Sequence, residues 1–176
     1  LLCEKYRYTP DEKNIAGSIN VIASNLDAIN TPEVLKKCFS IMDLTSLDSA
    51  DTPASIRAFV EKANAVTSSL PGYPLPASIC VYPNFAGIVR ENRCSPEMHV
   101  TTVAGCFPSS QSFLEVKARE CELAVEHGAD EVDIVLPLNS FLDSDMDAAR
   151  HELRTLKAAI DKAAAAQNRK VVLKTI

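Results

Sequence analysis

The sequence has no long apolar run and no cluster of basic residues. No stretch approaches the roughly 18–20 consecutive apolar residues of a membrane-spanning helix. The N-terminal stretch LLCEKYRYTP turns polar after two leucines, which argues against a signal peptide. The net charge is −5, and the Lys and Arg residues are scattered, whereas nucleic acids are bound by clustered cations. We therefore expect no nucleic-acid partner, no membrane association and a cytoplasmic location.

The six cysteines include no CxxC pair, the spacing most typical of structural zinc sites. We accordingly predict no metal site. Disulfide frameworks are typical of short secreted chains, whereas 176 residues can bury a core without them. We interpret the cysteines as reduced thiols. Glycine is also scarce, and neither G-x-G-x-x-G nor a Walker motif follows any expected strand, which disfavours the common nucleotide-binding folds.

The first 70 residues predict helices. Thr31 and Thr52 each precede a proline, the arrangement of an N-cap followed by the first helical position. The segment after Thr52 has apolar residues at helical spacing, and a further helix is expected near residues 15–29. Three prolines and a glycine in TSSLPGYPLP, residues 67–76, disfavour helix and central strand. We interpret this stretch as the joint between an N-terminal helical segment, 1–70, and the body, 71–176.

The body alternates between strand and helix patterns. Strands are predicted at 77–83, 98–105, 130–137 and 170–176. Helices are predicted at 84–92, 112–128 and 144–167, the second with a capping box of Ser112 and Glu115 and an end at Gly128. Such a chain builds a parallel sheet, either doubly wound or part of a (β/α)8 barrel.

The last predicted strand, VVLKTI, has no helix after it. Parallel strands are normally covered on both faces, and a closed barrel needs roughly 200 residues or more. We therefore expect an α/β fold in which this chain carries about the first four strands of a (β/α)8 TIM barrel, within a longer natural protein.

Two ionisable residues interrupt otherwise apolar strands. Val132 and Ile134 share one face of their strand and Asp133 lies on the other, because successive strand residues alternate. By the same alternation Lys174 points opposite to Leu173. Asp133 and Lys174 are therefore expected inside the barrel on adjacent strands. They are either a buried ion pair that fixes register or a proton-transfer site.

Five stretches make the chain resemble the deoxyribose-phosphate aldolases. They are IMDLTSL (41–47), ASICVYPNF (77–85), TTVAGCFPSS (101–110), GADEVDIVLP (128–137) and VVLKTI (171–176). The resemblance implies a class I aldolase on a (β/α)8 barrel without cofactor or metal. It also implies the reaction that cleaves 2-deoxy-D-ribose 5-phosphate to D-glyceraldehyde 3-phosphate and acetaldehyde through a lysine imine.

The resemblance assigns roles to five residues of this chain. Asp133 would transfer protons at the imine-forming step, and Lys174 would support its charge. Asp43 and Thr45 would lie near the substrate hydroxyls, and Cys80 would line the pocket. Asp48 stands where some members have Asn. The imine-forming lysine is expected two strands after the third, beyond Ile176, so this chain would contain none and would be inactive alone.

Other interpretations stay open at this point. The chain could be a non-catalytic half barrel whose edge another chain covers, or another Schiff-base aldolase of the same barrel type. The helical N-terminal part either plugs the barrel bottom or contacts a second subunit of a homodimer. His99, His127 and His151 are interpreted as surface or helix-end residues, and no Ser-His-Asp arrangement suggests a hydrolase.

Overall fold

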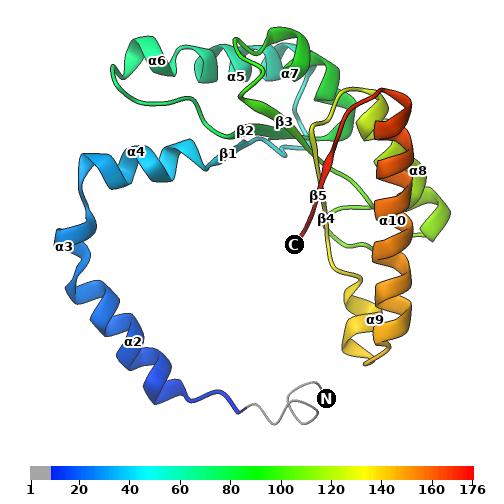
Figure 1. Ribbon diagram of the computed structural model, residues 1–176, viewed down its shortest axis with the longest axis horizontal. Helices are drawn as coiled ribbons and strands as arrows, with labels where there is room; N and C mark the ends of the chain where they lie inside the picture. Colours follow the sequence, from blue (N-terminus) through cyan, green and yellow to red (C-terminus); the bar gives the residue numbers. More distant parts are fainter. Residues whose placement is uncertain (1–8) are drawn as a thin grey trace.

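The computed structural model describes residues 9–176. Residues 1–8, with Cys3 and most of LLCEKYRYTP, lie outside the described residues. Five parallel strands form one sheet in the order of the sequence (Figure 1). The strands are β1 (Asp43–Thr45), β2 (Ser78–Val81), β3 (His99–Val103), β4 (Glu131–Ile134) and β5 (Val172–Thr175).

Helices follow each of the first four strands. After β1 come α5 (Pro53–Asn64) and α6 (Val66–Ser69), and after β2 come the 3-10 turn η1 (Pro83–Phe85) and α7 (Ala86–Asn92). After β3 comes α8 (Leu114–Glu126), and after β4 come α9 (Leu138–Leu142) and α10 (Met146–Ala166). Before β1 lie α2 (Glu12–Ser24), α3 (Leu26–Ile29) and α4 (Pro32–Ser40). The β-α alternation in sequential strand order is that of an opened (β/α)8 barrel.

The strand β1 was not predicted from the sequence, although the other four were. It pairs with β2 in the register Asp43↔Ser78 and Thr45↔Cys80. Only Leu44 is apolar among its three residues, so neither alternation nor an apolar run marks it. The sheet therefore holds five strands rather than the four expected.

Several local predictions are confirmed and some are wrong. Thr31 and Thr52 cap α4 and α5 through their side chains, as expected. The capping box at Ser112 is wrong, because α8 begins at Leu114 after Phe113 and has no side-chain cap. Residues 67–69 lie in the short helix α6, within a stretch that we expected to be non-helical. The helix α9 was not predicted.

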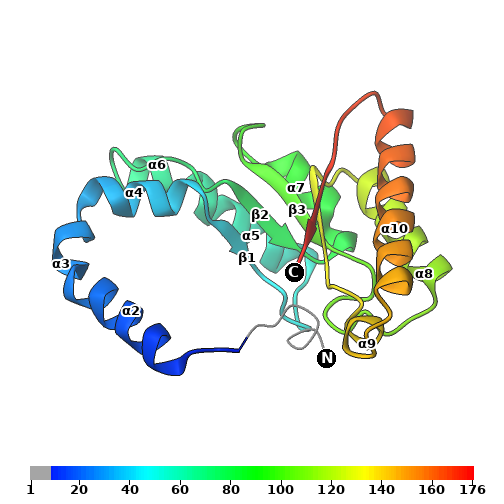
Figure 2. The same ribbon diagram turned by 60° about the horizontal axis from the view of Figure 1, so that its bottom comes forward.

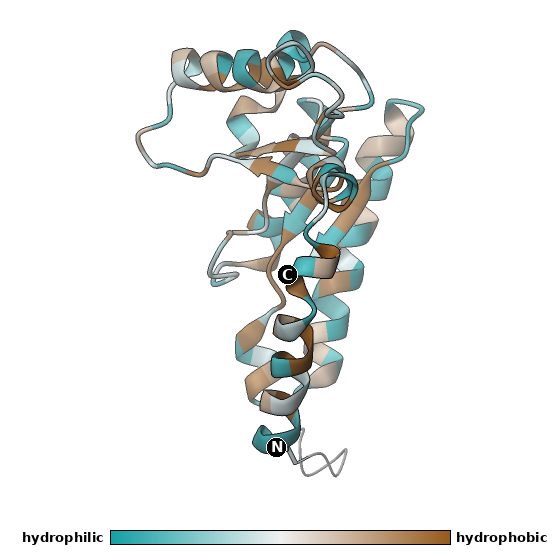
Figure 3. Ribbon diagram, turned by 90° about the vertical axis from the view of Figure 1, so that its left-hand side faces the viewer, coloured by the Kyte–Doolittle hydropathy of each residue, from teal (hydrophilic) through white to brown (hydrophobic). Residues whose placement is uncertain are grey.

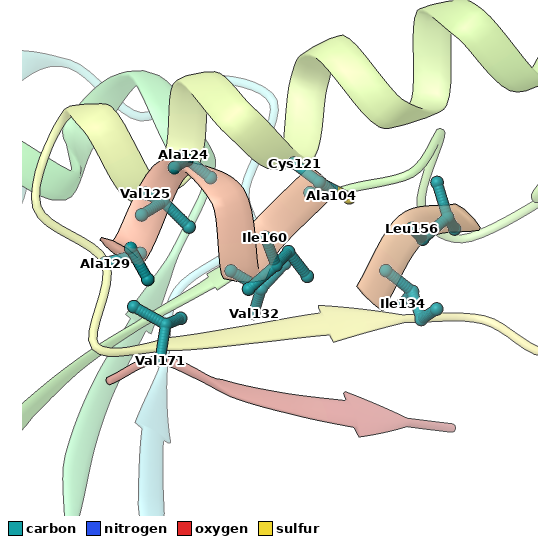
Figure 4. Close-up of a cluster of buried hydrophobic side chains, with 12 residues drawn as sticks. Ala104, Cys121, Ala124, Val125, Ala129, Val132, Ile134, Leu156, Ile160 and Val171 are labelled. Carbon is teal, nitrogen blue, oxygen red and sulfur yellow. The ribbon is translucent and has the colours of Figure 1, made fainter. Parts of the chain in front are cut away.

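Two clusters of buried apolar side chains cover the outer face of the sheet. Val132 and Ile134 of β4 pack with Leu156 and Ile160 of α10 and with Cys121 of α8, all less than 2% exposed (Figure 4). Burial of each such aliphatic side chain stabilises the fold by about 1.5–3 kcal/mol. The second cluster packs α5 and α7 on β2 and β3. The predicted face assignment is confirmed, since these residues face helices and Asp133 faces inward.

The helices α2, α3 and α4 reach away from the sheet (Figures 1 and 2). None of their residues is buried, and apolar residues alternate with polar ones along α2 (Figure 3). The division at residue 70 stays a prediction, although β1 and α5 both join the sheet and its core. Among the described residues, no helix is long and apolar enough to cross a membrane.

Candidate active site

Charged side chains gather on the inner face of the sheet. Asp43 comes from β1, Glu131 and Asp133 from β4, and Lys174 from β5. These four residues are called the interior cluster. The register pairs Asp133 with Lys174 directly, as the alternation of the two strands predicts. The expected meeting of Asp133 and Lys174 is therefore present in the structure.

The ammonium of Lys174 lies among three carboxylates. Its Nζ donates a hydrogen bond to Asp43 Oδ2 at 2.6 Å, and lies 2.9 Å from Glu131 Oε2 and 3.1 Å from Asp133 Oδ1. Burial alone would lower the pKa of Lys174, but these acidic partners outweigh it and raise the pKa above its ordinary value. Lys174 is therefore a fixed cation near neutral pH.

The carboxylate of Asp43 is held by a chain of hydroxyl groups. Ser78 donates to Asp43 Oδ1 at 2.6 Å, and Thr101 donates to Ser78 at 2.8 Å. Burial would raise the pKa of Asp43, but the hydrogen bonds from Lys174 and Ser78 lower it below its ordinary value. Asp43 therefore stays ionised and anchors Lys174.

The pKa of Asp133 is displaced in the opposite direction to that of Asp43. Asp133 is 7% exposed, and its Oδ1 has no hydrogen bond of good geometry from the described residues although Lys174 is close. Burial raises the pKa of Asp133, and the nearby charges of Asp43 and Glu131 add to this, while Lys174 opposes it only in part. Two carboxylates beside one ammonium thus have pKa values displaced in opposite directions, a pattern typical of acid–base sites.

Glu131 is a member of the cluster that the sequence analysis missed. It lies two residues before Asp133 and therefore on the same face of β4, a signal that was available from alternation. Its Oε1 also lies 2.6 Å from His99 Nδ1. His99 is about half exposed, as its interpretation as a surface residue suggested, but its contact with the cluster was not predicted.

Sequence comparison finds a relative described as a putative deoxyribose-phosphate aldolase. A putative deoxyribose-phosphate aldolase of Caenorhabditis elegans is 32% identical over 155 residues, which cover 87% of the chain and 51% of that protein. The chain is thus homologous to this putative deoxyribose-phosphate aldolase. It spans about half the length of the relative that it matches. No protein-family model matches the chain.

Solved structures of aldolases share the fold. A putative deoxyribose-phosphate aldolase from Coccidioides immitis superposes with a TM-score of 0.66 at 20% identity, covering 80% of the chain and 49% of that structure. The aldolase QR15 gives 0.63 at 23% identity, covering 78% and 53%. The deoxyribose-phosphate aldolase of Aeropyrum pernix, described as a tetramer, gives 0.57 at 21% identity, covering 94% and 59%. The partial TIM-barrel architecture is thereby confirmed.

Of the remaining residues that the aldolase resemblance singled out, Thr45 and Cys80 lie on strands of the sheet and Asp48 lies in the turn after β1. Cys80 is buried on β2, and burial together with the charge of Asp133 raises the pKa of its thiol to about 11. Thr45 is exposed and its hydroxyl donates to the carbonyl of Asp43 at 3.0 Å. Asp48 accepts a hydrogen bond from the backbone N–H of Ala50 at 2.9 Å, which is the capping of a turn.

The described residues hold no group of three or more His, Cys, Asp or Glu side chains arranged to bind a metal ion. Instead, the interior cluster surrounds an ammonium group with acids. Such an arrangement makes one carboxyl group hold its proton more tightly while a permanent cation lies next to it. It is suited to moving protons at a carbonyl or imine carbon.

Proposed function

We propose that the natural protein carrying this chain is a Schiff-base aldolase that cleaves and forms 2-deoxy-D-ribose 5-phosphate. The products of cleavage would be D-glyceraldehyde 3-phosphate and acetaldehyde. The observation that supports this most is the interior cluster, in which Asp133 has a raised pKa beside a lysine that cannot lose its proton. The homology to putative deoxyribose-phosphate aldolases agrees with it.

The proposed reaction needs a neutral amine as nucleophile and an acid–base group beside it. The amine adds to the aldehyde carbon to give a carbinolamine, and loss of water then leaves the imine. Protonated Asp133 would donate the proton that the departing hydroxyl needs, and its carboxylate form would take a proton from the carbon next to the imine. The Lys174 ammonium would stabilise the carboxylate form of Asp133 during each transfer.

Lys174 is unsuited to be the nucleophile itself. Its contacts with Asp43, Glu131 and Asp133 stabilise the protonated ammonium, which has no lone pair for attack. An imine-forming lysine normally has a lowered pKa, toward roughly 7–8. We therefore propose that the nucleophile is a lysine in a segment after Ile176.

Asp43, Thr45 and Cys80 have supporting roles in this proposal. Asp43 and Thr45 lie on β1, and the register pairs Thr45 with Cys80 of β2. Asp43 and Thr45 would contact the substrate hydroxyls, and Cys80 would line the pocket. Asp43 already accepts from Lys174 and Ser78, so a substrate hydroxyl would use a remaining lone pair of its oxygens.

Reductive trapping tests the proposal. The natural protein and residues 1–176 alone would each be incubated with 2-deoxyribose 5-phosphate and borohydride, and adducts would be located by peptide mass spectrometry. We expect an adduct in the natural protein on a lysine after Ile176, and none in residues 1–176. Incubation with borohydride but without the sugar phosphate is the control.

Two results would contradict the proposal in different ways. An adduct on Lys174 would show that the assignment of the nucleophile is wrong. Absence of any adduct in the natural protein would favour a non-catalytic half barrel, and adducts with other aldehyde phosphates alone would favour a different Schiff-base aldolase.

A further inference from the structure

Glu131 connects the interior cluster to a histidine at the start of the neighbouring strand. On one side its Oε1 lies 2.6 Å from Nδ1 of His99 in β3, and on the other its Oε2 lies 2.9 Å from Nζ of Lys174 in β5. The Glu131 side chain is 16% exposed and that of His99 is 48% exposed. A continuous path of polar contacts therefore runs from a half-exposed imidazole through Glu131 to Lys174.

Three carboxylates compete for the Lys174 ammonium, and this competition decides where the ammonium lies. A lysine ammonium has three donors on a flexible stem, so it moves toward whichever acceptors attract it most. Here the hydrogen bond goes to Asp43 and the Glu131 contact is shorter than the Asp133 contact. Glu131 pairs in register with Val172, two residues before Lys174, so it draws the ammonium back along β5.

We propose that Glu131, shared between His99 and Lys174, is a positioning residue that draws the Lys174 ammonium away from Asp133 and so keeps Asp133 able to bind and release a proton. This inference rests on the proposed function, in which Asp133 is the proton-transfer group. Neither Glu131 nor His99 needs to touch the substrate.

Every strand contributes a titratable group to the interior cluster or to its surroundings. These groups are Asp43 of β1, Cys80 of β2, His99 of β3, Glu131 of β4 itself and Lys174 of β5. The Cys80 thiol, with a pKa raised to about 11, stays neutral at the pH of the experiment. The balance therefore depends on the two other carboxylates, the ammonium and the imidazole.

Changes at Glu131 and His99 should act in opposite directions. Glu131→Gln removes a negative charge near Asp133 and frees Lys174 to approach it, so Asp133 should bind its proton less tightly. His99→Gln removes the imidazole that competes with Lys174 for Glu131, so Glu131 should hold Lys174 more strongly and Asp133 should bind its proton more tightly.

The test uses the natural protein with E131Q and H99Q, and two matched controls. E126Q removes a glutamate on the surface of α8 that pairs with Arg119, and H151Q removes an exposed histidine of α10. Two quantities are measured in each variant: the pH dependence of kcat/KM for 2-deoxyribose 5-phosphate, and the titration midpoint of the Asp133 carboxyl carbon by ¹³C NMR. Circular dichroism checks that each variant is folded.

We expect the acidic limb of the profile and the NMR midpoint to move down by about one pH unit in E131Q. Both should move up in H99Q, and neither should move in the two controls. An Asp133 midpoint unchanged in folded E131Q, or moved in the same direction by both variants, would overturn the inference. A protein without aldolase activity that still shows the opposite NMR shifts would support the positioning by Glu131 while overturning the proposed function.

Discussion

At the residue scale, Asp43 and Asp133 share one ammonium and yet respond to it differently. Asp43 accepts hydrogen bonds from Lys174 and Ser78, whereas Asp133 is more deeply buried and has a poorly aligned contact with Lys174. Hydrogen bonds to the charged form outweigh burial in the first case, and burial outweighs the ion pair in the second. Burial and hydrogen-bond alignment thus separate a carboxylate that stays ionised from a candidate acid–base group.

This difference predicts opposite effects on stability. The pKa of Asp43 is lowered, so its contribution is present above the unfolded pKa near 4 and is lost as pH falls through the folded pKa. The pKa of Asp133 is raised, so its contribution is present at low pH and is lost as pH rises through the folded pKa. At neutral pH, Asp43→Asn should lower the free energy of unfolding by about 1–2 kcal/mol, whereas Asp133→Asn should leave it unchanged or raise it.

Urea unfolding of the natural protein checks this at neutral pH and again near pH 3.5. The penalty of Asp43→Asn should shrink at the lower pH, because the unfolded Asp43 is then largely protonated. A larger loss of stability in Asp133→Asn than in Asp43→Asn at neutral pH would show that this account of the two carboxylates is wrong.

The sequence allowed part of this site to be predicted. Alternation along β4 and β5 placed Asp133 and Lys174 on one face, and the register brings them together. It did not indicate that Asp43 and Glu131 would bind the same ammonium. Those contacts depend on sheet curvature and on the register of β1, a strand too short to be recognised.

At the scale of elements, a buried ion pair links the β3–α8 connection to α10. Lys117 of α8 pairs with Glu152 of α10, and its Nζ donates to the carbonyl of Ser110 at 2.9 Å and to the Ser110 hydroxyl at 3.3 Å. The Lys117 side chain is 3% exposed. A second contact lies nearby, where Glu120 accepts a hydrogen bond from the backbone N–H of Cys106 at 2.7 Å. Together, this hydrogen bond and the Lys117 contacts fix the loop before α8, where a capping box was expected. Local sequence could not predict it, because Glu152 lies 35 residues away.

Breaking this pair should destabilise the protein strongly. Glu152→Gln leaves the Lys117 ammonium buried without an anion, which costs about 3–5 kcal/mol in comparable cases. The double variant K117M/E152L should recover most of that loss, since an apolar pair needs no desolvated charge. Thermal and urea unfolding measure both variants, and E122Q on the outer surface of α8 serves as a control. A single variant as stable as the unchanged protein would contradict the role of the pair.

At the scale of the whole molecule, the sheet has two strands with one neighbour each. Within the described part of the chain, β1 pairs with β2 alone and β5 with β4 alone. Large apolar side chains are exposed at the β5 edge and along the N-terminal arm, which consists of α2, α3 and α4. Among them are Val172, 52% exposed, and Ile22, 63% exposed. The sequential strand order could be predicted from the β-α alternation. What covers these edges could not be predicted, because it depends on the surface that packs against them. A closed barrel removes such edges altogether.

The open edges predict how residues 1–176 behave in isolation. Unpaired strand edges and exposed apolar surface promote association between chains. We expect this segment alone to elute from size-exclusion chromatography above its monomer mass and to bind the dye ANS. The natural protein should bind little ANS under the same conditions, because a barrel closed by a further segment would cover both edges.

Two variants of the isolated segment locate the surface that drives its association. If edge pairing drives it, Ile176→Glu at the β5 edge should reduce dye binding more than Ile22→Glu in the arm. A monomeric segment that binds no ANS would contradict the expectation that these open edges promote association.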